Sequence, residues 1–378
     1  MKIVILNNLY APYKRGGAEV IMERIANGLK NMGHDITVVS TRSYFKKCAR
    51  ESTNNIPVAR FRSLFHDLNK MPKIFRLIWH FLDIISVKKF FYLKKNIRKQ
   101  KPDLVISANM KGLGYLSWLA VGKKIKLIHI LHDINLLHPS GLMYWGKEKI
   151  LNKFTSNVYQ LICAYATRNV DAVISPSKWL LDIHQDYGLF KRCKKLVLAN
   201  PQLKQESDVT MFTKNHDTFK FIYIGQLEEH KGIDILIKAF DNLDTKIKTK
   251  CKLQLVGTGS LEMKIRSLKM NFLDVLGYKE HPEAMEILKT CDSLVMPSLC
   301  YENSPTAIYE AILFNKFVIA SRLGGIPELV DDSCLFEPGD TDDLTDKMTK
   351  ILSLDNSIIK KNTTIPTVSQ YISRILTI

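Results

Sequence analysis

The stretch LVMPSLCYENSPTAIYEA, residues 294–311, decides the fold. Its apolar start, residues 294–296, predicts a buried strand, because a short apolar run that ends at a proline is typical of the core of a parallel sheet. Asn303 and Ser304, followed by Pro305, predict the start of a helix. A strand that leads directly into a helix indicates an α/β fold, and the N–H groups at the start of such a helix form a site for phosphate.

Two carboxylates, Glu302 and Glu310, flank this predicted helix start. Acids are poorly suited to binding a bare anion, but they suit a ligand that carries hydroxyl-rich sugars on both sides of its phosphates. A nucleotide sugar is such a ligand. The alternative is that one glutamate is a solvated loop acid and the other an ordinary residue of a helix surface.

The same alternation of strand and helix extends through the chain. It predicts two doubly wound, Rossmann-like α/β domains that face a cleft, with ligands bound beyond the carboxyl ends of the strands. The predicted strands are 3–6, 36–39, 104–107, 127–131, 172–175, 221–224, 253–256, 273–276, 294–296 and 317–320, and the clearest helices are 19–30, 232–240 and 306–314. We place the first domain at 1–198 and the second at 199–365, joined near Pro201 by a polar linker, 204–217.

The net charge of +18 is unevenly distributed. Residues 1–198 hold 34 Lys and Arg against 12 Asp and Glu, a net charge of +22. Residues 199–378 hold 21 Lys and Arg against 25 Asp and Glu, a net charge of −4. The basic half predicts a negatively charged partner, which is an anionic membrane surface, a phosphorylated substrate or a nucleic acid. No nucleic-acid binding module accompanies the charge, so we expect no nucleic acid.

Cysteine spacing and hydropathy indicate a cytoplasmic protein. The seven cysteines, Cys48 among them, form no CxxC pair, which favours reduced thiols and no zinc. The first apolar run is too short for a signal peptide, and no apolar run is long enough for a spanning helix.

In the predicted first domain, two loops that follow strands carry candidate site residues. Gly16 and Gly17 precede the first helix, where glycine lets the backbone approach a phosphate or a sugar, although a plain turn would look the same. His132 follows the strand 127–131 and is placed either for proton transfer near neutral pH or for a structural role. No G-x-G-x-x-G occurs here, so the nicotinamide fingerprint is missing.

The loops of the predicted second domain add further candidates. Lys231 precedes a helix and would offset the charge of a departing diphosphate, unless it is only a solvated lysine. Gly257 and Thr258 follow one strand, where glycine permits close contact with a ligand. Tyr278 follows the next strand and is a candidate to cover a base.

The order of these motifs resembles the retaining glycosyltransferases of family 4, which have the GT-B fold. The resemblance covers roughly residues 1–340. It rests on the pair Gly16 and Gly17, the turn His132-Asp133, GQLEEHKG (225–232), GTGS (257–260), the E-x7-E unit from Glu302 to Glu310, and GGIPE (324–328). One departure is that Gln226 stands where the family usually has arginine.

The resemblance also implies roles. Glu310 would bind the ribose hydroxyls, Lys231 the diphosphate and Glu302 the donor sugar, and His132 would contact that sugar near the reacting carbon. The backbone of residues 303–307 would hold the diphosphate and the sugar. The resulting donor site contains Gly16, Gly17, Gln226, Gly257, Thr258, Tyr278, Asn303, Ser304, Pro305, Thr306, Ala307 and Glu310, with His132, Lys231 and Glu302 as catalytic residues. Residues 366–378 resemble the family's last helix, which returns to the first domain.

Residues 73–101 mix aromatic and aliphatic side chains with a dense run of lysine and arginine. Such a segment is typical of a helix at an anionic membrane interface. The alternative is a core helix with a solvated basic end.

Together these features predict an enzyme that moves a hexose-type sugar from a UDP- or GDP-linked donor to an acceptor hydroxyl, with retention of the anomeric configuration. The acceptor would be a saccharide or a lipid-linked molecule of cell-envelope polysaccharide synthesis, and the enzyme would be cytoplasmic or peripheral on the membrane. We expect no cofactor and no metal, because Lys231 and helix N-termini would offset the charge of the diphosphate. The alternatives are a nucleotide-sugar 2-epimerase and a binding protein without turnover.

Overall fold

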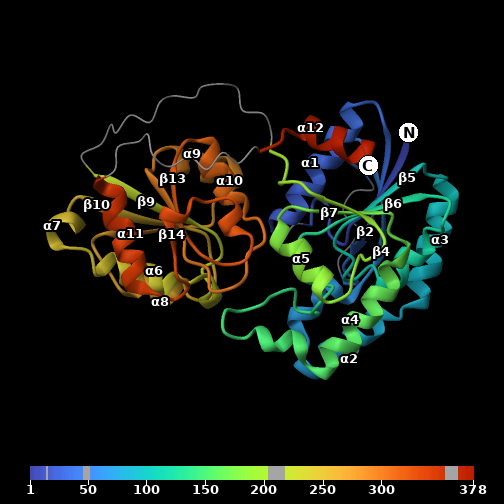
Figure 1. Ribbon diagram of the computed structural model, residues 1–378, viewed down its shortest axis with the longest axis horizontal. Helices are drawn as coiled ribbons and strands as arrows, with labels where there is room; N and C mark the ends of the chain where they lie inside the picture. Colours follow the sequence, from blue (N-terminus) through green and yellow to red (C-terminus); the bar gives the residue numbers. More distant parts are fainter. Residues whose placement is uncertain (14–15, 46–51, 203–217, 354–364) are drawn as a thin grey trace. The chain divides into compact units, whose positions relative to one another are not determined.

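The computed structural model describes residues 1–13, 16–45, 52–202, 218–353 and 365–378 (Figure 1). The predicted linker 204–217 and Cys48 lie outside the described residues. The chain forms two compact units, which are described separately. The first holds Met1–Leu142, Lys149–Lys204 and Ile365–Ile378, and the second holds Met143–Glu148 and Gln205–Thr364.

The first unit is built on an eight-stranded sheet in the order β3-β4-β2-β1-β5-β6-β7-β8. All neighbours pair in parallel except β3 and β4, which are antiparallel. The inner strands are nearly continuous runs of buried apolar residues, as expected for a parallel sheet covered on both faces. The strands are β1 (Lys2–Leu6), β2 (Asp35–Arg42), β3 (Ser52–Thr53), β4 (Ile56–Arg62), β5 (Leu104–Ser107), β6 (Lys126–Ile130), β7 (Ala172–Ser175) and β8 (Lys194–Val197).

Helices connect these strands. The α-helices are α1 (Gly17–Asn31), α2 (Lys73–Ile84), α3 (Val87–Gln100), α4 (Phe154–Ala166), α5 (Lys178–Asp186) and α12 (Val368–Thr377). Short 3-10 helices lie between them: η1 (Leu64–Lys70), η2 (Tyr115–Ala120), η3 (Glu148–Asn152) and η4 (Thr167–Asn169). Helices α2, α3 and α4 all contact η2.

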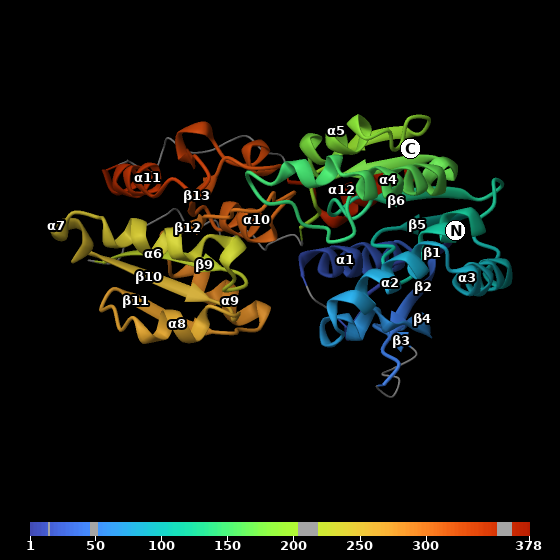
Figure 2. The ribbon, with the colours of Figure 1, turned by 90° about the horizontal axis from the view of Figure 1, so that it is seen from below.

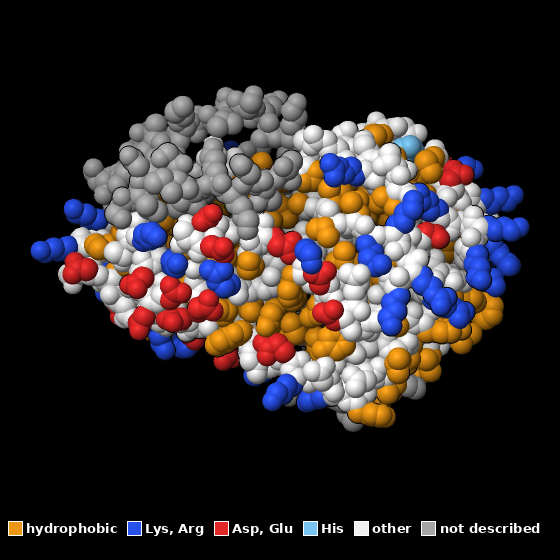
Figure 3. All heavy atoms as spheres, in the orientation of Figure 1, with side chains coloured by type: hydrophobic (Ala, Val, Ile, Leu, Met, Phe, Trp, Pro, Cys, Tyr) orange, Lys and Arg blue, Asp and Glu red, His pale blue; other side chains and the backbone are white. Residues whose placement is uncertain are grey.

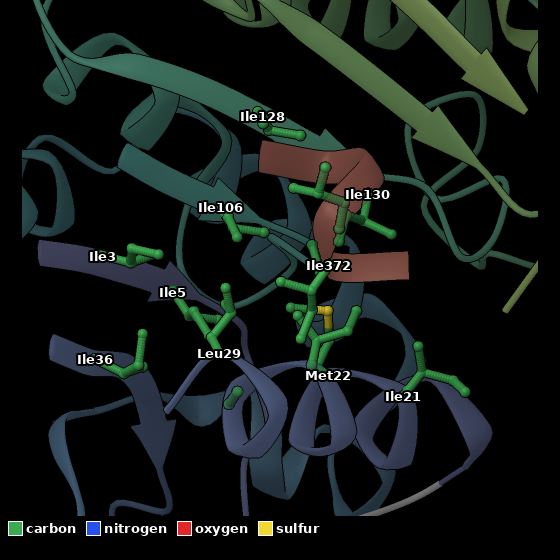
Figure 4. Packing of buried hydrophobic residues seen from close by; sticks show 14 of the residues in the cluster. Ile3, Ile5, Ile21, Met22, Leu29, Ile36, Ile106, Ile128, Ile130 and Ile372 are labelled. Carbon is green, nitrogen blue, oxygen red and sulfur yellow. The ribbon is translucent and has the colours of Figure 1, made fainter. Parts of the chain in front are cut away.

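One face of this sheet is covered by α1 and the C-terminal helix α12, whose buried side chains share one core with β1, β2, β5 and β6 (Figure 4). Gly28 allows the two helices to approach closely. A Cβ atom at Gly28 would lie only 2.4 Å from Val368 Cγ1 and 2.5 Å from Ile372 Cδ1. The last helix of the chain is therefore part of the core of the first unit.

The second unit has a six-stranded parallel sheet in the order β11-β10-β9-β12-β13-β14, and Figure 2 shows β11 to β13 in this order. Strand β9 lies in the middle, so the loops after β9 and β12 are neighbours. The strands are β9 (Phe219–Ile224), β10 (Cys251–Val256), β11 (Leu273–Gly277), β12 (Ser293–Met296), β13 (Phe317–Ser321) and β14 (Leu335–Phe336).

Helices cover both faces of this sheet. Figure 1 shows α6, α8 and α11 on one face and α9 and α10 on the other. A core of buried aliphatic and aromatic side chains lies between α6, α11 and the strands. The elements are η5 (Glu229–Lys231), α6 (Ile233–Asp241), α7 (Thr245–Lys248), α8 (Glu262–Ser267), α9 (His281–Lys289), α10 (Thr306–Leu313), η6 (Ile326–Glu328), η7 (Asp332–Cys334) and α11 (Thr341–Ser353).

The predicted fold class is confirmed, because both sheets are wound with helices and all strand pairs except β3 with β4 are parallel. Strands β5 and β7 begin and end at the residues predicted for them. The prediction did not find β4, β8 or the two-residue strands β3 and β14. It also began the helix after β9 one residue early: Gly232 lies in the left-handed region with φ +73°, and α6 starts at Ile233.

Candidate functional site

The candidate loops of the second unit follow the carboxyl ends of β9, β10, β11, β12 and β13, which lie at one edge of its parallel sheet. Ligands of doubly wound sheets bind at this edge. Backbone hydrogen bonds of 2.8 to 2.9 Å join neighbouring loops. In each of them an N–H group donates to the carbonyl oxygen of another loop: Leu227 to Thr258, Gly257 to Gly277, Leu299 to His230, and Gly325 to Glu302. The loops therefore support one another.

Two glycines make this close stacking of loops possible. Gly257 has φ +139°, and a Cβ atom there would lie 1.8 Å from the carbonyl oxygen of Gly225. Gly324 has φ +65°, and its Cβ would lie 2.2 Å from the carbonyl oxygen of Glu302. A side chain at either position would push apart the loops that carry the candidate site residues.

Lys231 and Glu302 form an ion pair at this edge, in which Lys231 Nζ donates to Glu302 Oε1. Their side chains are only 20 % and 21 % exposed. Lys231 ends η5, directly before Gly232, where a Cβ atom would lie 1.8 Å from the carbonyl oxygen of Pro297. This close approach places Lys231 beside the loop that carries Glu302.

The surroundings of the ion pair keep Lys231 charged. Burial is the largest single effect and would lower the pKa of Lys231. The Glu302 carboxylate, together with Cys300 and Tyr144, outweighs it, so the pKa is raised above its usual value. Ser298 Oγ also donates to Glu302 Oε1, at 3.3 Å. The Cys300 thiol is 3.7 Å from the same oxygen, and burial, together with the Glu302 charge, raises its pKa to about 12. Cys300 is therefore a neutral thiol and a poor nucleophile.

Glu310 lies in α10, and its Oε1 is 2.8 Å from Nε2 of His281 at the start of α9. The Glu310 side chain is 10 % exposed and the His281 side chain 55 % exposed. The contact orients the carboxylate and occupies one of its oxygens. The other oxygen remains able to accept hydrogen bonds from a pair of ligand hydroxyls.

Helix α10 begins at Thr306, as predicted, but its N-cap residue is Pro305 and not Asn303 or Ser304. The side chain of Pro305 offers no hydrogen-bond acceptor. Ser304 does not cap the helix either, because its Oγ is 2.6 Å from the hydroxyl of Tyr309. The N–H groups of Thr306 and Ala307 lie at the start of the helix, where Pro305 provides no capping side chain. A helix start of this kind is suited to binding an anion. Asn303 precedes this turn and is buried.

The remaining candidates of the second unit are more exposed. Gln226 and Thr258 are exposed in the loops after β9 and β10, and the backbone carbonyl of Gln226 accepts a 2.8 Å hydrogen bond from the Tyr223 hydroxyl. Tyr278 is 66 % exposed, and its hydroxyl is 3.1 Å from Glu280 Oε1. Whether Tyr278 covers a base therefore stays a prediction.

A short segment from the first half of the chain, Met143–Glu148, packs on the second unit. We call it the strap. Trp145 N–H donates to Leu299 O at 2.9 Å, and Tyr301 N–H donates to Met143 O at 2.9 Å. The Tyr301 hydroxyl donates to Glu148 Oε1 at 2.8 Å. The strap therefore holds the residues on either side of Cys300, close to Glu302.

Three candidates belong to the first unit. Gly17 begins α1, and the N–H of Gly16 donates to Glu19 Oε2 at 2.8 Å, so the side chain of Glu19 caps this helix start. His132 follows β6, and burial lowers its pKa to about 4, which leaves the imidazole neutral at pH 7. A neutral His132 can donate or accept one proton but does not supply charge.

Within the described residues, no group of three or more His, Cys, Asp and Glu side chains is placed to hold a metal ion. Lys231 is the lysine that pairs with Glu302 at this edge. Among the helices that the structure describes, none has both the length and the apolar character that crossing a membrane requires.

Comparison with known proteins assigns the family. The sequence matches the family Glycosyltransferase Family 4 over residues 15–201 and the family Glycosyl transferases group 1 over residues 204–364. The chain belongs to these glycosyltransferases. The predicted recognition is confirmed, and the two matches cover the parts of the chain that carry the predicted motifs.

Relatives of this glycosyltransferase include two curated proteins. An uncharacterized 42.6 kDa protein in the cps region of Klebsiella pneumoniae is 29 % identical over 338 residues, 87 % of each chain. The GalNAc-alpha-(1->4)-GalNAc-alpha-(1->3)-diNAcBac-PP-undecaprenol alpha-1,4-N-acetyl-D-galactosaminyltransferase of Campylobacter jejuni is 25 % identical over 339 residues, 86 % of this chain and 81 % of that protein. Among solved structures, HepE of Anabaena in complex with UDP has a TM-score of 0.66 and 20 % identity, and covers 100 % of this chain and 95 % of HepE. This last likeness shows the fold, which is GT-B.

Sequence reasoning missed two parts of this edge in the glycosyltransferase. His281 is 29 residues from Glu310, and no local pattern connects them. The strap comes from the first half of the chain and contacts the second unit, so its position depends on tertiary structure alone. Glu302 lies on the loop after β12, and Glu310 lies in helix α10, which follows that loop. The Glu302 carboxylate contacts Lys231, whereas the Glu310 carboxylate contacts His281.

Proposed function

We propose that this glycosyltransferase moves a hexose-type sugar from a UDP- or GDP-linked donor to an acceptor hydroxyl, with retention of configuration and without a metal. The acceptor would be a saccharide or a lipid-linked intermediate of cell-envelope polysaccharide synthesis. The enzyme would work in the cytoplasm, peripherally on the inner face of the membrane.

The observation that carries this proposal is the ion pair of Lys231 and Glu302 beside the start of α10. A pair of opposite charges, four-fifths buried, at a ligand-binding edge suits a ligand that is itself both anionic and rich in hydroxyls. Lys231 would contact the diphosphate, and Glu302 the hydroxyls of the donor sugar. Glu310, oriented by His281, would then accept hydrogen bonds from the ribose.

The proposed reaction needs no covalent enzyme intermediate. The acceptor oxygen forms a bond to the anomeric carbon while the bond from that carbon to the diphosphate oxygen breaks. Attack and departure occur on the same face of the sugar, and the departing phosphate oxygen takes the acceptor proton. Lys231 and the N–H groups at the start of α10 would stabilise the charge that develops on the diphosphate. The neutral thiol of Cys300 favours this route over a covalent one.

The names of relatives support the choice of substrates. The Campylobacter relative is named as a transferase acting on an undecaprenol-linked glycan, and the Klebsiella relative is encoded in a cps region. HepE was solved in complex with UDP. These proteins suggest an undecaprenol-type acceptor and a uridine nucleotide as the first substrates to try.

Incubation of the purified protein with single nucleotide sugars, without acceptor, tests the proposal. A thermal-shift screen of UDP and GDP sugars first selects the donor. Slow hydrolysis of that donor, unaffected by EDTA, is the expected result. An epimerised donor sugar would instead indicate a 2-epimerase, and tight binding without any hydrolysis or transfer would indicate a binding protein. Loss of activity with EDTA that a divalent ion restores would refute the metal-free reaction.

A further inference from the structure

Helix α4 of the first unit presents apolar side chains to the solvent. Four residues at spacings of four, three and four form one stripe along the helix. They are Phe154, Val158, Leu161 and Tyr165, which are 82 %, 41 %, 72 % and 52 % exposed. In a surface helix of a soluble protein this stripe would normally face the core.

The opposite face of α4 holds polar groups that are buried and hydrogen-bonded. Ser156 Oγ donates to Ile150 O at 2.7 Å, and the Tyr159 hydroxyl donates to Asn135 O at 2.5 Å. Gln160 Nε2 donates to Leu137 O at 3.1 Å and to Leu151 O at 2.9 Å. Rotating the apolar stripe inward would break all of these bonds and leave buried polar groups unpaired, so the outward orientation is built into the helix.

Helix α4 itself carries no charged side chain, and basic residues stand in the segments before and after it. Lys149 and Lys153 precede the helix and Arg168 follows it, all of them exposed. The Arg168 guanidinium lies 3.9 Å from the centre of the Tyr165 ring. The side chains of tyrosine and arginine each have an apolar body and a polar tip. Such side chains are typical of the boundary between apolar and aqueous surroundings.

Helices α2 and α3 contact η2, as α4 does, so the three helices pack around the same 3-10 helix. Phe75, Ile78 and Leu82 of α2 are more than half exposed and lie on one face of that helix. Along the lower right edge in Figure 3, where Figure 1 shows α2 and α4, apolar side chains lie among basic ones. Helix α3 carries exposed basic residues as well: Lys88, Lys95, Arg98 and Lys99.

Part of the predicted basic and aromatic segment does not belong to this surface. Lys89 donates to the buried carboxylate of Asp83, and Trp79 is buried in a core cluster with Phe65 and Leu68. The segment 73–101 is therefore divided between the core and the solvent.

We propose that α4, together with the outward face of α2, seats the first unit on the surface of a bilayer that contains anionic lipid. The occupant is a lipid surface because the stripe consists of aliphatic and aromatic side chains and the residues that flank it are basic. Apolar side chains bind a membrane interface by leaving water, and basic side chains bind it by attraction to anionic lipid. This membrane contact rests on the proposed function, because it assumes that the acceptor is lipid-linked. A bilayer contact at α4 would bring the enzyme to such an acceptor without a spanning helix.

Sedimentation with vesicles tests the seat, using phosphatidylcholine alone and phosphatidylcholine mixed with phosphatidylglycerol. The parent protein should bind the anionic vesicles, less so at high salt, and bind the neutral ones weakly. The double variant Phe154→Gln/Leu161→Gln should lose at least about tenfold in its partition onto anionic vesicles, because two large apolar side chains no longer leave water. Met263→Gln, in α8 of the second unit, is the matched control, since Met263 is 80 % exposed and its loss should change nothing.

Three outcomes would overturn the proposal. The first is equal binding of the double variant and the parent to anionic vesicles, and the second is equal binding of the parent to both vesicle types. The third is self-association of the parent in sedimentation velocity that the double variant abolishes, which would make the stripe a contact between copies. Circular dichroism and UDP or GDP binding without vesicles show that the variant is folded. That nucleotide measurement also separates the two ideas, because failure of the parent to bind nucleotide would refute the proposed function and leave the vesicle result standing.

Discussion

Replacing Lys231 with methionine should destabilise the second unit and also remove most of the turnover. Lys231 Nζ donates to Glu302 Oε1, and each of the two side chains is about one-fifth exposed. The substitution leaves the Glu302 carboxylate largely buried without its cation. A second substitution, Glu302→Gln, removes that charge and so tests whether the loss of stability comes from the unpaired carboxylate.

The burial of the pair sets the size of the effect on stability. Removing one partner of a fully buried pair costs about 3–5 kcal/mol, and an exposed pair contributes about 0.2–1 kcal/mol. With both side chains four-fifths buried, we expect Lys231→Met to lower the free energy of unfolding by about 2 kcal/mol. For a unit of this size that corresponds to a fall in Tm of about 4–8 °C. The double variant should recover at least half of this loss.

Turnover should behave differently. If Lys231 offsets the charge of the departing diphosphate, its removal should lower kcat about 10²- to 10³-fold, the typical effect of losing one group placed to stabilise transition-state charge. The double variant should regain stability but not turnover. Lys231→Arg keeps the charge and serves as the control, with stability close to that of the parent.

Differential scanning calorimetry and donor hydrolysis rates on the four proteins decide between these possibilities. Recovery of turnover together with stability in the double variant would mean that Lys231 acts only by compensating Glu302. An unchanged Tm in Lys231→Met would show that the ion pair contributes nothing in solution. Either result would refute the reasoning.

Three further outcomes follow from other residues. Gln226→Arg should tighten nucleoside diphosphate binding at low salt, with a gain that shrinks as salt rises, and unchanged affinity in calorimetric titrations would show that this turn does not reach the diphosphate. Burial lowers the pKa of His184 to about 4, so stability present above about pH 6.5 is lost as pH falls toward 4. His184→Met should therefore remove about 2 kcal/mol of acid destabilisation at pH 4.5 in urea titrations, and an unchanged pH dependence would contradict this. Tyr301→Phe breaks the bond to Glu148 and should cost about 1 kcal/mol and speed hydrogen exchange of the strap amides, and an unaltered exchange rate would show that this bond does not hold the strap.

The inner strands were predictable because strands buried on both faces are continuous apolar runs. Strands β5 and β7 are LVIS and AVIS, fully buried, and their bounds follow from hydropathy alone. Strand β8, KKLV, lies at the edge of the sheet and is largely exposed, and β4 is IPVARFR, with a proline and two arginines. Charges and proline are tolerated near a sheet edge, so these two strands lack the apolar signal.

The candidate site was predictable where its chemistry is local in sequence. Glu302 and Glu310 flank one loop and helix start, and this spacing is visible in the sequence. The contact from His281 to Glu310 joins α9 to α10, and the strap reaches Leu299 and Tyr301 from more than 150 residues earlier in the chain. Such contacts depend on the order of strands in the sheet, which a one-dimensional pattern does not contain.

Helix α4 illustrates a different reason for a missed feature. Its apolar residues recur with a helical period, which by pattern alone would place them against the core. The buried hydrogen bonds of Tyr159 and Gln160 turn the stripe outward instead. Polar residues that find partners inside the protein can therefore invert the face that hydropathy assigns.

The central claim is that the loop edge of the second unit binds the nucleoside diphosphate of a sugar donor through Glu310 and its neighbours. Calorimetric titration of UDP and GDP into the parent protein and Glu310→Ala tests it most directly. We expect at least one nucleotide to bind the parent, and to bind the variant about 10- to 100-fold more weakly, since hydrogen bonds to a charged group contribute about 1.5–3 kcal/mol. Equal affinity of parent and variant for that nucleotide, with both proteins folded, would contradict the account.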